Sequence, residues 1–101
     1  MGMSLTVDCP NGVPAWSEVA DWLTAHGSPA QLRMIDGQLA FPDEQPPADW
    51  HELRVALPAG ILTLRREENA IAVVTWGNAD EALQRDWKLL AQGFAEVGGG
   101  R

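Results

Sequence analysis

Three strand-like runs follow one another between residues 51 and 76, with only short turns between them. The runs read HELRVAL, ILTLRRE and AIAVVTW, and turn residues separate them at positions 58–60 and 68–69. Turns this short join neighbouring strands in antiparallel order, because a parallel connection needs a crossover of a dozen residues or more. We therefore expect a fold built on an antiparallel sheet.

Two further strands are expected in residues 31–41, QLRMIDGQLAF. Polar and apolar residues alternate on both sides of Asp36 and Gly37, and Asp-Gly is a strong hairpin signal because both residues accept the positive φ of a type I′ turn. The stretch at residues 41–50 contains three prolines and three carboxylates. Proline lacks the amide hydrogen that a central strand or a helix interior needs, so we expect a rigid surface loop there.

Helical spacing marks two segments near the ends of the chain. In residues 13–26 and 79–97, apolar side chains recur every three or four positions, and a glycine follows each segment. Asn78 is expected to cap the second helix while Glu81 reaches back to it, an Asn variant of the capping box. Both segments are predicted to be amphipathic helices.

The predicted order, α-β-β-loop-β-β-β-α, indicates an α+β fold. We expect a single two-layer domain, with an antiparallel five-stranded meander-like sheet and the N- and C-terminal helices packed on one face. A chain of 101 residues suits one domain with one core. We assign residues 13–97 to this domain, residues 1–12 to an N-terminal tail or short strand, and residues 98–101 to a flexible C-terminal tail. The strand order stays open, because the loop can cross to either edge of the sheet.

Composition argues against several kinds of partner. The net charge is -7, and no run of Lys or Arg could follow a phosphate backbone or an anionic membrane surface. We therefore expect neither a nucleic acid nor a membrane as partner. The lone Cys9 cannot form an internal disulfide, and there is no signal-peptide pattern and no stretch of about 18 apolar residues. These features fit a cytoplasmic protein, and six arginines against one lysine suggest a bacterial source.

Motifs that carry catalysis or metal binding are missing from the sequence. The serines lie in no G-x-S-x-G elbow, and neither H-E-x-x-H nor paired cysteines nor an EF-hand loop occurs. The glycines at positions 98–100 lack the strand and helix of a phosphate-binding loop. We assign no catalytic residue, no metal and no cofactor, and the sequence favours a protein that is not an enzyme.

A rim between two loops is the best candidate ligand site. Trp50 and His51 lie on one loop, and Trp76 and Asn78 lie on the other. Loops supported by a rigid sheet are where sites concentrate, and His51 could transfer a proton while Asn78 orients a ligand.

The same residues also have structural explanations. Trp76 can be the last buried side chain of a strand, and Asn78 can be a helix cap. Glu52 or Arg54, beside His51, can form an ion pair across the strands with Arg33, Arg65 or Glu67.

The last strand-like run, residues 70–76, is apolar on both faces. If both helices lie on one face, the second face needs cover from a homodimer formed sheet to sheet, from a bound partner chain or from a long loop. We expect a homodimer, because symmetric dimers are the commonest oligomers.

Three residues are candidates for contact with a partner protein. Trp22 departs from the apolar stripe of the first helix and could be an exposed aromatic anchor, although a broad buried face would also hold it. Asp43 and Glu44 make the proline loop acidic. The sequence thus favours a small, non-catalytic protein-interaction module of the chaperone or adaptor kind. The alternative is a small-ligand-binding domain or minor enzyme with its pocket at the two-loop rim.

Overall fold

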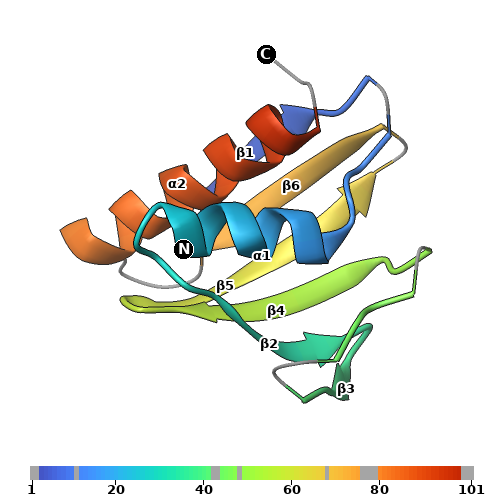
Figure 1. Cartoon of the computed structure of the whole chain (residues 1–101), viewed down its shortest axis with the longest axis horizontal. Helices are drawn as coiled ribbons and strands as arrows, with labels where there is room; N and C mark the ends of the chain where they lie inside the picture. Colours follow the sequence, from blue (N-terminus) through green and yellow to red (C-terminus); the bar gives the residue numbers. More distant parts are fainter. Residues whose placement is uncertain are drawn as a thin grey trace.

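The computed structural model describes residues 3–10, 12–41, 44–47, 49–67, 69–75 and 80–98. One antiparallel sheet of six strands, in the order β1-β6-β5-β4-β2-β3, carries two helices on one face (Figure 1). The predicted α+β architecture is confirmed, with six strands where five were expected. The elements are β1 (Met3–Asp8), α1 (Trp16–Ala25), β2 (Gln31–Ile35), β3 (Gln38–Leu39), β4 (Glu52–Leu57), β5 (Gly60–Glu67), β6 (Ala70–Thr75) and α2 (Glu81–Val97).

The additional strand is β1, in the segment expected to be a tail or short strand. It pairs with β6 along its whole length, from Met3 opposite Thr75 to Asp8 opposite Ala70. Its partner is the last strand of the chain, so no local turn signal identifies the pairing. β1 therefore forms one edge of the sheet, and the hairpin strand β3 forms the other.

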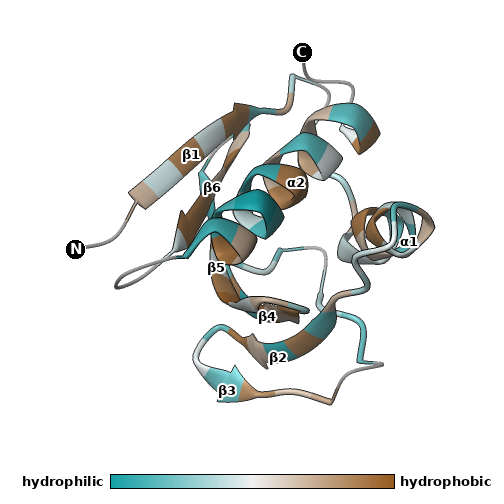
Figure 2. Cartoon of the chain, turned by 90° about the vertical axis from the view of Figure 1, so that its left-hand side faces the viewer, coloured by the Kyte–Doolittle hydropathy of each residue, from teal (hydrophilic) through white to brown (hydrophobic). Residues whose placement is uncertain are grey.

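One face of the sheet packs against both helices and forms the core (Figure 2). Alternate strand residues point to this face, and apolar helix residues at three- and four-residue spacing meet them. Trp87 of α2 also donates its indole N–H to Val73 O of β6, at 2.7 Å. The fully buried aliphatic and phenyl side chains of this core are Val19, Leu23, Leu32, Leu53, Val55, Leu62, Leu64, Ile71, Val73, Leu90 and Phe94.

The two helices meet where α2 carries a glycine. A Cβ on Gly93 would lie 3.0 Å from Cε3 of Trp22, closer than ordinary van der Waals contact. Gly93 thus leaves room for Trp22 of α1, whose Nε1 donates to Glu96 Oε2 at 3.0 Å.

α2 begins at Glu81, and its N-cap is Asp80. The Asp80 carboxylate accepts a hydrogen bond from the amide of Leu83 at 2.9 Å, which satisfies one of the first-turn amides that have no partner within the helix. The prediction that Asn78 caps this helix was wrong, because the helix begins two residues later than expected and Asp80 is its N-cap. Neither α1 nor α2 is long and apolar enough to cross a membrane.

The second face of the sheet is left uncovered by the helices. The residues of β6 on this face are Ala70, Ala72 and Val74, as expected from the apolar run. The neighbouring strand β1 adds side chains that are polar and exposed, namely Ser4, Thr6 and Asp8. The second face is therefore more polar than residues 70–76 alone indicated.

The hairpin expected at Asp36 and Gly37 is confirmed as the β2–β3 turn, and both residues have positive φ, 49° and 83°. The Asp36 carboxylate also accepts hydrogen bonds from the backbone amides of Glu52 and His51, at 2.8 Å each. These two hydrogen bonds favour the charged form and lower the pKa of the Asp36 carboxyl group. The turn is thereby tied to the start of β4.

We expect Asp36 to make the stability of the protein depend on pH. Its pKa is lower in the folded protein than in the unfolded chain, so its stabilising contribution is present above the unfolded value of about 3.9. The contribution is lost as the pH falls through the folded pKa. D36N keeps an acceptor oxygen and tolerance of positive φ but removes the charge.

Thermal unfolding of wild type and D36N between about pH 2 and pH 7 measures this effect. D36N should have the lower Tm at neutral pH, and the difference should shrink in acid. A difference that stays constant over this range would show that the charge of Asp36 plays no part.

Candidate functional site

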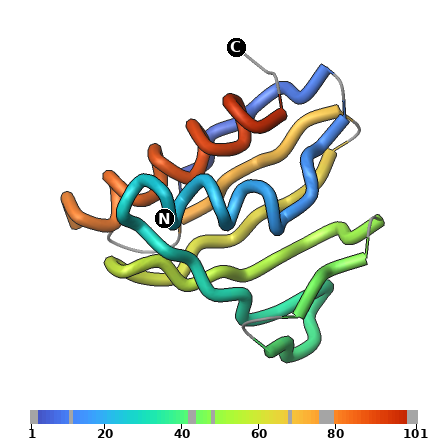
Figure 3. The backbone as a smooth tube through the Cα atoms, viewed as in Figure 1, coloured from blue at the N-terminus to red at the C-terminus, as the bar shows by residue number. Residues whose placement is uncertain are grey.

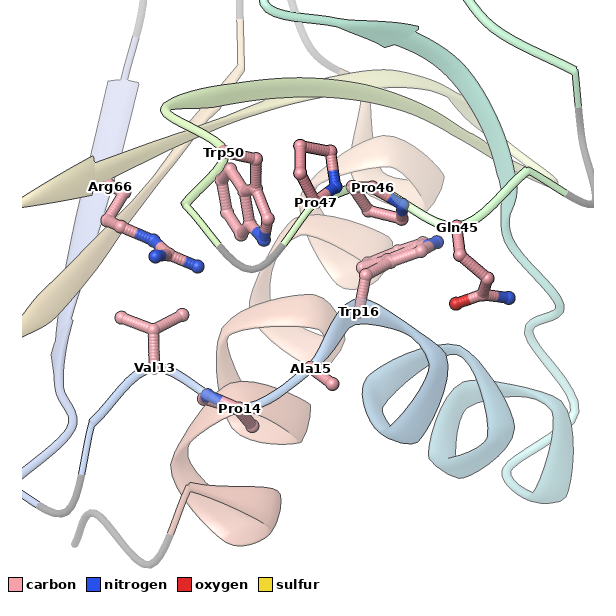
Figure 4. A pocket seen from close by; sticks show the side chains of 9 residues that line it. All are labelled: Val13, Pro14, Ala15, Trp16, Gln45, Pro46, Pro47, Trp50 and Arg66. Carbon is pink, nitrogen blue, oxygen red and sulfur yellow. The ribbon is translucent and has the colours of Figure 1, made fainter.

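A pocket of about 180 Å³ lies between the segment that enters α1 and the proline loop (Figure 4). Its residues come from three parts of the chain: the approach to α1, the loop before β4, and the end of β5. They are Val13, Pro14, Ala15, Trp16, Gln45, Pro46, Pro47, Trp50 and Arg66. The walls are thus mostly aromatic and proline rings.

Two buried tryptophans line the pocket. Trp16 is the first residue of α1 and is 4% exposed, and Trp50 ends the proline loop and is 2% exposed. The Trp16 ring lies 6.4 Å, centroid to centroid, from the ring of Phe94 in α2, which holds it against the core. The amide of Trp50 donates to Pro47 O at 3.1 Å, so the prolines form a turn that places the second indole.

Arg66 supplies the charge in the pocket. Its Cζ lies 4.6 Å from the centroid of the Trp50 ring, a cation–π distance. Its backbone amide donates to His51 O at 2.8 Å, which extends the pairing of β4 and β5 by one step and fixes where the side chain starts. The described residues of the lining include this guanidinium and no carboxylate.

This arrangement suits a small group that combines an apolar or planar part with an anionic or carbonyl oxygen. Aromatic and proline rings offer flat apolar contact, and a guanidinium can bind a carboxylate in bidentate geometry. The pocket is smaller than the 300–1,000 Å³ typical of ligand sites. It therefore fits a small molecule or a single side chain rather than a large cofactor.

The structure brings only part of the predicted ligand rim into this pocket. Trp50 lines it, whereas His51 is exposed and takes part in the sheet through its backbone. Trp76 and Asn78 lie outside the described residues. The predicted ion pair beside His51 is confirmed as Glu52 with Arg65, at 3.4 Å between Oε2 and Nε.

Trp16 and Arg66 were missed as pocket residues. Helical spacing predicts a core side chain at Trp16, which it also is, and the polar end of the run ILTLRRE predicts a solvent-exposed face for Arg66. Arg66 instead pairs with Ile71, whose side chain is buried in the core, so both residues point to the helix side. The pairing register of β5 with β6 determines the direction of the Arg66 side chain, and this register cannot be derived from the local sequence.

The residues predicted to contact a partner have different surroundings. Trp22 is half-buried, bonded to Glu96 and stacked on His26 with ring centroids 3.7 Å apart. Glu44 is exposed and closes a turn, since its Oε1 accepts from the Phe41 amide at 3.3 Å. Asp43 lies outside the described residues.

An exposed apolar patch on the β2–β3 hairpin was not predicted. Leu39 is 89% exposed and Phe41 is 75% exposed. Met34, half-buried, pairs with Leu39 across the hairpin. We call Met34, Leu39 and Phe41 the hairpin patch. Met34 pairs with the exposed Arg54 of β4, and Leu39 pairs with Met34. Both side chains therefore project to the second face of the sheet, which the helices do not cover.

Cys9 is buried beside the core, with its thiol 3.8 Å from Val7 O. Burial, and to a smaller extent the charge of Asp8, raise the pKa of this thiol, so it stays protonated and is a poor nucleophile. Among the described residues, no three His, Cys, Asp or Glu side chains gather in a way that could hold a metal ion.

Comparisons with protein-family models, with curated proteins and with solved structures found no match to this chain.

We expect Trp22 to stabilise the packing of α1 on α2. W22A removes the ring that lies over Gly93, and with it the hydrogen bond to Glu96, so it should lower the free energy of unfolding by about 2 kcal/mol. Urea denaturation monitored by circular dichroism measures the loss, and W22F, which keeps a ring but no N–H, should lose less. An unchanged midpoint for W22A would mean that Trp22 is a surface residue available to a partner.

Proposed function

We propose that the protein is a non-catalytic protein-interaction module that binds an extended, apolar and basic segment of a partner through the hairpin patch. The observation that carries the proposal is the exposure of Leu39 and Phe41, at 89% and 75%. Large apolar side chains gathered at one exposed place mark interaction sites, because leaving them in water is unfavourable.

The backbone of the hairpin gives these side chains a common direction. The Ala40 amide donates to Arg33 O at 3.0 Å, so the extended pairing continues past the end of β3. Leu39 and Phe41 are two residues apart in this extended stretch and therefore point to the same side. An extended partner segment with apolar residues at alternate positions would match this spacing.

Charge sets the second requirement on the partner. The protein has a net charge of -7, and in the chain the exposed Asp36 lies between Met34 and Leu39 and the exposed Glu44 follows Phe41. A segment with Lys or Arg beside its apolar residues would be attracted to this surface and held in register. The lone, buried Cys9 is consistent with such a role in the cytoplasm.

We expect peptides selected from a random display library on the wild-type protein to alternate apolar residues and to carry Lys or Arg. The double variant L39S/F41S should bind the selected peptides at least about tenfold more weakly in fluorescence anisotropy, because two apolar contacts are lost. I61S is the matched control, since Ile61 is 54% exposed but lies on β5, and its affinity should be that of wild type. Equal binding by L39S/F41S, or no selected peptide, would contradict the proposal.

A second candidate function rests on the Trp16 and Trp50 pocket. A small carboxylate with an apolar or planar body would contact the indoles and the Arg66 guanidinium together. This is the alternative of a small-ligand-binding domain, placed in a pocket to which Trp50 of the rim expected from sequence contributes.

Ligand-observed NMR with a library of small aromatic and aliphatic carboxylates tests this candidate. Ala15 is exposed and lines the pocket, so A15W should fill its mouth and abolish binding while leaving the core intact. A15S keeps the pocket open and should bind as wild type does. Fragments that bind A15W and A15S equally would place their site elsewhere.

A further inference from the structure

The two edges of the sheet are built differently. At one edge, β3 has only two residues, and β2 beside it carries an irregularity between Leu32 and Met34. At the other edge, β1 has six residues and pairs with β6 in unbroken register. Short or irregular edges resist pairing with other chains, whereas long regular edges favour it.

The backbone groups on the open side of β1 can be identified from the pairing. The Cys9 amide donates to Asn69 O at 2.7 Å, so the backbone of Cys9 faces β6. In an antiparallel strand the direction alternates along the chain. The N–H and C=O groups of Ser4, Thr6 and Asp8 therefore point away from β6, to a side on which the sheet has no described strand (Figure 2).

The sequence of β1 lacks the features that usually protect an edge. MSLTVD contains no proline and no lysine, and its single charge is Asp8 at the end. Thr6 and Val7 in its middle also have high strand propensity. An edge that is long, regular and almost uncharged is a template for pairing with another strand.

We propose that β1 pairs antiparallel with β1 of a second copy of this chain, so that the two sheets join into one across a two-fold axis. A second copy fits because an antiparallel edge contact is self-complementary: each copy offers the same alternating donors and acceptors. This dimer is edge to edge, and it adds no cover to the second face of either sheet.

The outward groups select one register. With Thr6 of both copies on the axis, Ser4 lies opposite the second copy's Asp8, and all outward amides and carbonyls pair. The same register puts Leu5 opposite Val7, so the apolar face continues across the junction. A shift that set Asp8 opposite Asp8 would place like charges together and is disfavoured.

The position of α2 supports this dimer. α2 packs on both β1 and β6, so the helix axis lies about midway between these two strands. Because neighbouring strands are about 4.8 Å apart, the axis of α2 would lie roughly 5 Å from the two-fold axis of the dimer. The two α2 helices would then be about 10 Å apart, at the upper end of the distance of packed helices. Helical spacing puts the half-buried Ala95 on the flank of α2 opposite Gly93, which faces α1, and its small side chain permits that approach, while the exposed Lys88 lies on the same flank two turns earlier.

Sedimentation velocity on the full chain tests the proposal with T6P. Wild type should be a dimer, and T6P should raise the dimer dissociation constant at least about tenfold, because proline removes an outward N–H at the centre of the contact. Proline is tolerated on an edge strand where the N–H faces solvent, so the fold should remain. T6V keeps the N–H and should dimerise as wild type does.

Disulfide trapping in a C9A background tests the register independently. T6C should form an intermolecular disulfide under mild oxidation, because residues directly opposite each other lie within the Cα distance that a disulfide spans. S4C should not, since the two Ser4 residues would be roughly 14 Å apart. A monomeric wild type, a T6P dimer of unchanged affinity, or trapping through S4C instead of T6C would overturn the proposal. Peptide binding at the hairpin patch is measured by a different experiment on different residues, so the dimer proposal and the proposed function can be contradicted independently.

Discussion

The pairing of β1 with β6 places the first strand of the chain beside the last one (Figure 3), and the pocket and one open edge of the sheet follow from it. The chain must then run from the end of β1 back over the sheet to start α1. On this path, residues 13–16 lie beside Trp50 and Arg66, and together they line the pocket. The same pairing makes β1 an edge and adds polar side chains to the second face of the sheet.

The two ends of the sheet present different chemistry to other molecules. The β3 end offers the side chains of Leu39 and Phe41, while its strand is too short to offer a regular row of backbone groups. The β1 end offers the backbone donors and acceptors of Ser4, Thr6 and Asp8, whose own side chains are small and polar. Apolar side chains can select a partner by shape. A free strand edge accepts any compatible strand, so its simplest partner is the same edge of a second copy of the chain.

Local signals predicted most of the fold correctly. Asp36 and Gly37 identified the hairpin, because only a few residue pairs accept two consecutive positive φ angles. The short turns after β4 and β5 identified the meander, and helical spacing identified α1 and α2. The cap of α2 was misplaced by two residues because both Asn78 and Asp80 can accept the hydrogen bond, and the choice depends on where the helix starts.

The candidate site was less predictable, for a physical reason that Trp50 and Arg66 illustrate. Trp50 stood out because it lies on a loop supported by the sheet, where binding sites concentrate. Arg66 did not stand out, because it follows Arg65 on a strand, and charged strand residues are usually expected on a solvent-exposed face. Its direction depends on the register with β6, and Ile71 opposite it lies on the core side.

The sequence by itself determined the element types, the antiparallel neighbours joined by short turns, and the acidic character of the surface. These properties depend on residues close together in the chain or on composition alone. The tertiary structure decided that β1 is a strand, which edges stay open, which side Arg66 faces and that Leu39 and Phe41 remain in water. Each of these depends on contacts between segments far apart in the sequence, which no local pattern contains.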